Sequence, residues 1–209
     1  MKGDLFNIMK KRTRTIQSVK GEIRILAIKD VPLNDPLRPL WVIGVIFRGG
    51  YWLDGMMRTQ IPAEELDATP GLIEMIRSSP HYDQIRVIML DNIVLGRRKI
   101  VDIDELYEKT GKPVILLMDR RPSTRDLLER QYETTENDLA TRVFEKIGKG
   151  VELNLGERGQ KFMWSVGLSN HVAERIVGRT TREGDTPEAL RVAKLVSSAF
   201  LYMLLDSKV

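Results

Sequence analysis

Three aspartates stand directly after apolar runs that are typical of buried strands. Asp30 ends the run RILAIKD, Asp91 ends IRVIMLD and Asp119 ends KPVILLMD. Ligand sites in open α/β sheets lie where strands end at the carboxyl edge, so these carboxylates are expected at one edge. Carboxylate oxygens are ligands for Mg²⁺ and Mn²⁺, and such ions neutralise the charge that develops during phosphodiester hydrolysis. The pattern favours metal-assisted phosphoryl chemistry; the alternative is that each aspartate is a turn or cap residue.

The composition limits the other kinds of site. The chain has no cysteine and only two histidines, His81 and His171, which excludes disulfides, thiolate catalysis, cysteine-bound zinc and a histidine-rich metal site. Any metal must therefore be held by oxygen, which again favours Mg²⁺ or Mn²⁺. The net charge of +4 permits nucleic-acid binding without requiring it.

The length of 209 residues, with 42% of them hydrophobic, predicts a single domain with one good core over residues 1–209. Residues 1–20 contain KKRTRT, a basic segment that is either a solvated tail or a phosphate contact. The sequence has no signal-peptide pattern and no run of apolar residues long enough to span a membrane. We therefore expect a cytoplasmic protein with no membrane partner.

The elements that must position these aspartates follow from periodicity and turn residues. A hairpin turns at Gly49 and Gly50, between two strands in the segment 40–62. Pro70 suits the first turn of a helix that ends by Pro80. Further strands are predicted at 22–28, 85–91, 112–119, 151–155 and 161–168, and helices at 101–111, 123–132, 170–180 and 186–205. A hairpin followed by alternating strands and helices indicates an α/β fold, with a mixed sheet that carries helices on both faces.

The amino-acid sequences of several segments resemble those of a known family. GVIFRGGYWLDGMM, LDAT, IRVIMLDNI and TPEALRVAKLVSSA are similar to segments of the archaeal endonuclease dU family, itself similar to endonuclease V. The resemblance covers about residues 22–200. It implies a ribonuclease H-like fold of endonuclease V type, and hydrolysis of phosphodiesters in DNA or RNA that contains deaminated bases, with Mg²⁺ or Mn²⁺ as cofactor.

The resemblance also implies site residues. Asp67 of LDAT aligns with the acid that opens the first helix of endonuclease V, and Asp91 follows the fourth strand; both would be metal ligands. The family's first strand usually ends in IDD, whereas this chain reads IKD, so Lys29 stands at the first acid and Asp30 at the second. The C-terminal helix usually reads RLAH, whereas this chain reads RVAK, with Lys194 at the histidine.

Lys29 and Lys194 lead to two hypotheses about function. An ammonium group repels a divalent ion, so the sequence predicts weak Mg²⁺ binding, and Asp30 faces the other side of the strand from residue 29. If both lysines point inward, they pair with Asp67 and Asp91 or grip a phosphate; otherwise they point to solvent. The chain is then either an active endonuclease, or a non-catalytic paralogue that needs no cofactor and binds nucleic acid or has a structural role.

Basic residues near the predicted strand ends are candidate nucleic-acid contacts. Tyr51 and Trp52, beside the hairpin turn, could stack on bases, although cross-strand packing in the hairpin is the preferred explanation for these rings. The segments GRRK and DRR follow two successive strands and could contact phosphates, or be ordinary solvated loops. The candidate phosphate contacts are Arg48, Arg97, Arg98, Arg120 and Arg121.

Overall fold

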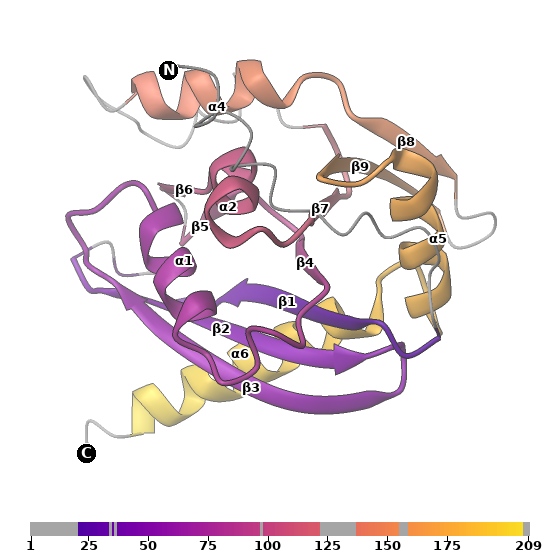
Figure 1. Cartoon of the computed structure of the whole chain (residues 1–209). Coiled ribbons are helices and arrows are strands. Elements are labelled where there is room, and N and C mark those ends of the chain that lie inside the picture. The colour runs from indigo at the N-terminus through magenta and orange to yellow at the C-terminus, as the bar shows by residue number, and fades with distance from the viewer. Residues whose placement is uncertain are drawn as a thin grey trace, which may run out of the picture.

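The computed structural model describes residues 21–33, 35, 37–96, 98–121, 137–154 and 159–206 (Figure 1). The basic segment 1–20, the helix predicted at 123–132 and Arg97 lie outside these residues. None of the helices in the described part is long and apolar enough to cross a membrane.

A mixed seven-stranded sheet forms the centre of the molecule, in the order β3-β2-β1-β4-β7-β9-β8. Its middle strands β1, β4 and β7 are parallel, while β2 and β3 extend it on one side and β9 and β8 on the other, all antiparallel to their neighbours. The strands are β1 Arg24–Asp30, β2 Leu40–Arg48, β3 Trp52–Ile61, β4 Val87–Leu90, β7 Val114–Met118, β8 Val151–Asn154 and β9 Gln160–Val166.

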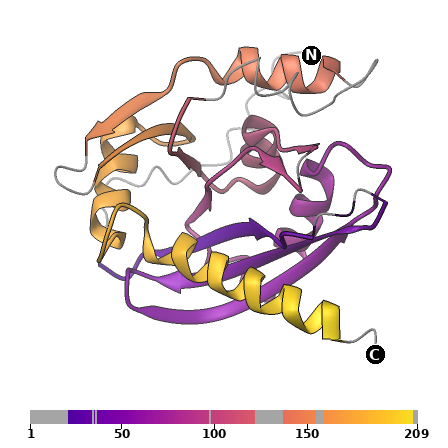
Figure 2. The same ribbon diagram turned by 180° about the vertical axis from the view of Figure 1, so that it is seen from behind.

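The sheet is covered on both faces, which explains why its central strands are apolar almost throughout. One core cluster contains Leu26 and Ile28 of β1 and packs against α1 Thr69–Arg77, α2 Ile103–Thr110 and α4 Asn137–Ile147. The other contains Ile25 and Ala27 and packs against α5 Asn170–Thr180 and α6 Glu188–Asp206. Helices α1 and α2 lie toward the viewer in Figure 1, and α6 crosses the opposite face in Figure 2. The predicted α/β sheet with helices on both faces is confirmed.

Local signals fix the ends of the helices that flank the site. Pro70 occupies the first turn of α1, where a missing N–H costs no hydrogen bond. The carboxylate of Asp102 accepts the backbone N–H groups of Asp104 and Glu105 at the start of α2, and Gly111 ends that helix with a left-handed φ of 64°. These residues set where α1 and α2 begin over the sheet.

Three features differ from the sequence expectation. The first strand extends to Asp30, so Lys29 and Asp30 belong to β1 itself. After Asp91 the chain makes a small hairpin of β5 Val94–Leu95 and β6 Lys99–Ile100, which was not predicted, because strands of two residues show no periodicity. Helix α4 was not predicted either.

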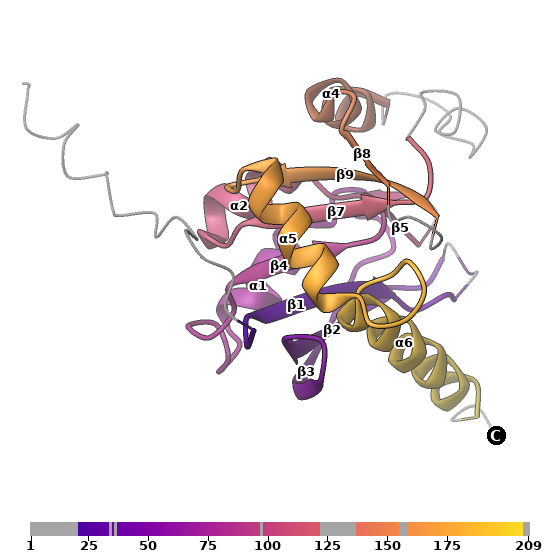
Figure 3. The same cartoon turned by 90° about the vertical axis from the view of Figure 1, so that its right-hand side faces the viewer.

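Helix α6 crosses the face of the sheet, and Phe200 in its C-terminal half packs edge-on against the Trp41 ring of β2, while the end of the helix projects away from the strands (Figure 3). Its first half packs on β1 and β2 through Leu190 and Ala193, both buried. Lys194 therefore lies on a part of α6 that is held against the sheet.

Candidate functional site

Lys29 and Asp91 form an ion pair at the carboxyl edge of the sheet. The Lys29 Nζ donates to both carboxylate oxygens of Asp91, at 3.0 Å and 2.9 Å. Both side chains are mostly buried, 21% and 29% exposed, and the strands that carry them are adjacent and parallel. The structure therefore brings together the residue at the family's first acid position and the aspartate after β4.

Asp30 also reaches Lys29 but lies on the other face of β1. Side chains alternate along a strand, so Lys29 shares the α6 face with Ala27, and Asp30 shares the α1 face with Ile28. The Asp30 Oδ1 lies 3.6 Å from the Lys29 Nζ, while Oδ2 accepts the backbone N–H of Gly96 at 3.0 Å. Burial lowers the pKa of Lys29, but the charges and hydrogen bonds of Asp91 and Asp30 outweigh burial and hold that pKa above its ordinary value.

Asp67 has a local role in the described structure. Its Oδ1 accepts the backbone N–H of Thr69 at 2.8 Å, at the start of α1, and its backbone bridges to Ile100 of β6. Among the described contacts, no hydrogen bond or ion pair joins its carboxylate to Lys29, Asp30 or Asp91. The structure thus places Asp67 as a helix-start residue beside the strand-end site.

The β5–β6 hairpin connects the segments that carry Asp30, Asp67 and Asp91. It follows Asp91 in the chain, it donates from Gly96 to Asp30, and its Ile100 is hydrogen-bonded to Leu66 and Ala68 on either side of Asp67. Lys99, which is 3% exposed, donates its Nζ to the backbone carbonyls of the 62–65 loop. This short hairpin therefore fixes the loops around the site.

A cavity of about 320 Å³ opens beside Asp91, which follows β4, and is also lined by residues from the end of β7, from β9, from the 183–186 loop and from α6. Lys194 lines it, as do Leu117 and Leu190. On the far wall, the buried Lys161 of β9 bonds to Asp119 and lies 3.1 Å from Asp185. Lys194 and Asp91 thus share one cavity.

Lys161 of β9 pairs with Asp119 after β7, much as Lys29 of β1 pairs with Asp91 after β4. The sequence analysis did not identify this second pair. Burial lowers the pKa of Lys161, but hydrogen bonds and charges from Asp119 and Asp185 raise it above its ordinary value overall. Although burial raises the pKa of Asp185, hydrogen bonds from Thr186 and Lys161 lower it below its ordinary value. A lysine at the start of a strand directly across from a strand-end aspartate is the signal that could have identified the pair.

The residues at this edge do not fit a divalent-metal site. Mg²⁺ requires carboxylate or other oxygen ligands, yet both oxygens of Asp91 already receive an ammonium group. Asp119 is likewise paired with Lys161. Among the residues that the structure describes, no group of three or more histidine, cysteine, aspartate or glutamate side chains could hold a metal ion.

The candidate phosphate contacts are dispersed. Arg48 lies at the opposite edge, where its Nε is 3.3 Å from Asp54 Oδ1 without hydrogen-bond geometry, and Arg24 pairs with the same carboxylate at 2.9 Å. Arg98 donates to the carbonyl of Ala63, and Arg121 lies over the ring of Phe162 and 3.9 Å from Glu152. Arg120 also has an interaction partner within the fold. Of this group, Arg98, Arg120 and Arg121 lie on the carboxyl side of the sheet.

The exposed rings at the hairpin turn are remote from Lys29. Tyr51 and Trp52 are 61% and 63% exposed, and the guanidinium of Arg182 lies 3.4 Å from the centre of the Tyr51 ring. Because the β2–β3 turn is at the start of β1, these rings lie at the edge opposite Asp30 and Asp91. They can contact a base at the Lys29 site only if the ligand spans the sheet.

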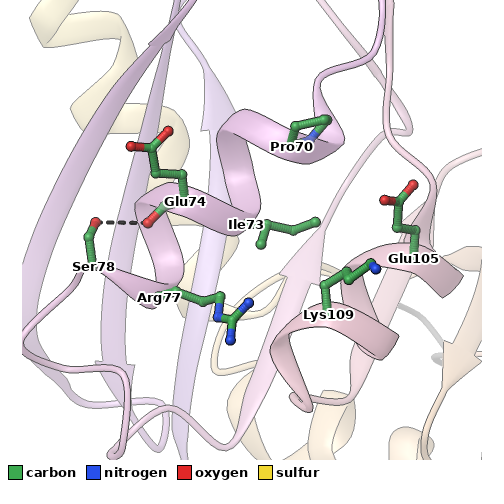
Figure 4. A pocket seen from close by; sticks show the side chains of 7 residues that line it. All are labelled: Pro70, Ile73, Glu74, Arg77, Ser78, Glu105 and Lys109. Carbon is green, nitrogen blue, oxygen red and sulfur yellow. Dashed lines mark hydrogen bonds between the residues drawn. The ribbon is translucent and has the colours of Figure 1, made fainter.

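A second hollow of about 510 Å³ lies between α1 and α2 (Figure 4). Ile73 and Arg77 point from α1 into the gap, and Glu105 and Lys109 line it from α2. It contains none of the strand-end aspartates or their lysines, so it is separate from the site.

Comparison with known proteins places this geometry in context. A UPF0215 protein of Methanosarcina mazei is 37% identical over 181 residues, which cover 86% of this chain and 91% of the relative. The crystal structure of an Archaeoglobus fulgidus protein of unknown function matches with a TM-score of 0.73 and 31% identity, over 86% of this chain and 99% of that one.

The fold is also that of endonuclease V. The endonuclease V of Ciona intestinalis, crystallised with DNA that contains an inosine, matches with a TM-score of 0.60 and 12% identity, over 90% of this chain and 89% of that one. The endonuclease dU family matches residues 21–201 of this chain. Since that match covers most of the 209 residues, the chain belongs to the endonuclease dU family.

Proposed function

We propose that this chain binds nucleic acid containing deaminated bases at the carboxyl edge of its sheet, without divalent-metal hydrolysis. The observation that carries the proposal is the Lys29–Asp91 ion pair, which lies at the strand ends of an endonuclease V fold. Membership of the endonuclease dU family and the endonuclease V-like fold support a nuclease-like function. The inosine-containing DNA bound by the Ciona intestinalis enzyme supports this class of ligand.

Lys194 is the residue best placed to contact a phosphate. It lines the cavity beside Asp91, and among the described contacts no carboxylate pairs with its ammonium group. By contrast, Lys29 and Lys161 are engaged by aspartates, and Arg191 is paired with Glu188. Phosphate contacts position a nucleic acid without reading its sequence, so Lys194 would contribute affinity and salt dependence.

Fluorescence anisotropy tests the proposal with labelled single and double strands that carry one uracil or inosine, or none. We expect saturable binding that is tighter for the deaminated strands and weakens as NaCl rises. Lys194→Ala should weaken binding about tenfold, the effect of roughly 1.4 kcal/mol. Lys149→Ala, which removes an exposed lysine that does not line this cavity, is the matched control and should bind like the parent protein.

Family membership favours a second candidate, a metal-dependent endonuclease. The same strands incubated with Mg²⁺ or Mn²⁺ discriminate between the two. Binding without cutting supports the proposal, whereas metal-dependent cutting that is lost in Asp91→Ala selects the second candidate. A chain that neither binds nor cuts any of these strands would contradict both.

A further inference from the structure

The ammonium of Lys29 lies among carboxylate oxygens from two adjacent strands. Both oxygens of Asp91 are within 3.0 Å of its Nζ, and Asp30 Oδ1 is at 3.6 Å. The second oxygen of Asp30 is held by the backbone N–H of Gly96, which fixes the orientation of that carboxylate. The Nζ therefore occupies a point on which three carboxylate oxygens converge.

We propose that Lys29 is a built-in cation, and that the carboxylates around it form a latent divalent-cation site of the Mg²⁺ and Mn²⁺ class, which the ammonium group keeps closed. The charges at this point are one ammonium and two carboxylates. A divalent ion added beside the ammonium meets a like charge within about 4 Å, and at that distance the repulsion opposes binding. Removing the ammonium leaves two carboxylates whose mutual repulsion favours a cation.

A single substitution, Lys29→Asp, should open the latent site. Residue 29 is on β1 next to β4, so a carboxylate there points toward the same space as Asp91. Aspartate is two bonds shorter than lysine, which leaves room for an ion about 2.1 Å from its oxygens. The site would then contain carboxylates from position 29, Asp30 and Asp91. This inference concerns metal binding alone and does not depend on the nucleic-acid ligand.

Titration with Mn²⁺, followed by the electron paramagnetic resonance signal of the free ion and by calorimetry, tests the inference. The parent protein and the charge control Lys149→Met should both bind Mn²⁺ weakly and without saturation. Lys29→Asp should bind one Mn²⁺ per chain at least tenfold more tightly than the control. Adding Asp91→Asn to Lys29→Asp should abolish that gain, because it removes a charged ligand from the site.

Lys29→Met provides a second variant if Lys29→Asp fails to fold, as judged by circular dichroism. It removes the ammonium without adding a ligand, so it should bind Mn²⁺ more tightly than the parent but less tightly than Lys29→Asp. Two results would overturn the inference: tight one-to-one binding by the parent that Asp91→Asn abolishes, or folded Lys29 variants that bind no better than the control. Both results concern metal binding. They are therefore distinct from a failure to bind nucleic acid, which would contradict the proposed function instead.

Discussion

Lys29 and Lys99 lie near the same edge of the sheet and are held in opposite ways. Lys29 is surrounded by the carboxylates of Asp91 and Asp30, which raise its pKa despite burial. Lys99 donates to the backbone carbonyls of Pro62, Ala63 and Glu65, and burial together with the charge of Arg98 lowers its pKa. Full negative charges offset the desolvation of one ammonium group, whereas carbonyl dipoles offset it only in part.

The difference separates two roles. Lys29 neutralises carboxylates and so decides whether the strand ends can accept a metal ion. Lys99 donates hydrogen bonds to the backbone carbonyls of the 62–65 loop, which leads into Asp67. One lysine sets the charge of the site, and the other sets the backbone that surrounds it.

Lys99→Met should cause the largest loss of stability. The change keeps the apolar stem but removes the ammonium donor from the carbonyls of Pro62, Ala63 and Glu65, in a position where Lys99 itself is 3% exposed. Pro62 still accepts the N–H of Glu65 and Ala63 still accepts from Arg98, so among the described contacts the carbonyl of Glu65 is the one that loses its donor. An unsatisfied buried acceptor costs about 1–3 kcal/mol, so we expect a loss of about 3 kcal/mol in the free energy of unfolding. Urea denaturation measures it.

Lys99→Arg is the control for that prediction, because it retains a cationic donor to the carbonyls. It should recover part of the stability lost in Lys99→Met. If the two variants are equally unstable, the carbonyl contacts are not the source of the effect, and the contrast with Lys29 fails.

A double-mutant cycle at Lys29 and Asp91 should show a smaller, coupled effect. Each single change, Lys29→Met or Asp91→Leu, leaves one charge without its principal partner, whereas the double change removes both charges. Because the pair is partly exposed, we discount the values for fully buried pairs and expect a coupling of about 1–2 kcal/mol. Urea denaturation of the four proteins measures the coupling. A coupling near zero would show that the ion pair neutralises the two charges without adding to the free energy of unfolding.

The sequence predicted the strands and helices of the molecule better than the contacts in its candidate site. Apolar runs and caps are local signals, so β1, β2, β4, β7 and α5 were predicted near their observed bounds. The family resemblance directed attention to Lys29 and Asp91, which meet in the structure although they are 62 residues apart in the chain. No periodicity marked Lys99 or Lys161, since their roles depend on loops and strand ends that tertiary packing brings together.

Two predicted site residues, Arg48 and Asp67, also show that the sequence alone does not predict which groups meet in the fold. Arg48 lies beside the Gly-Gly turn, and only the antiparallel register reveals that this turn is at the opposite edge from Asp91. The family resemblance implied that Asp67 is a metal ligand, but its carboxylate accepts from Thr69, as a helix-start residue does. Position in the sequence therefore identified both residues as candidates without determining their partners in the fold.

Lys161→Met should have a weaker effect than either change at the first pair. Lys161 is buried, but its partners Asp119 and Asp185 are 84% and 41% exposed, and water replaces a lost cation readily at exposed carboxylates. We expect a loss of about 0.5–1 kcal/mol in urea denaturation. A loss larger than that of Lys29→Met would mean that Lys161, rather than Lys29, is the main internal cation of this edge.

The smallest effect is a difference in pH dependence between the two lysines. Because the pKa of Lys29 is raised by folding, its stabilising contribution is complete below the unfolded value of about 10.4, and is lost as the pH rises through the folded value. Lys99 has the opposite sign: its pKa is lowered by folding, so the unfolded chain binds more protons and stability rises with pH up to about 10.4.

Urea denaturation at pH 9, 10 and 11 should therefore show two opposite trends relative to the parent. The stability lost in Lys29→Met should shrink as the pH rises, whereas the loss in Lys99→Met should grow. Each slope should be well below the limit of about 1.4 kcal/mol per pH unit that one whole proton would give. Parallel trends in the two variants would contradict the contrast, because both lysines would then respond to burial or to charge in the same way.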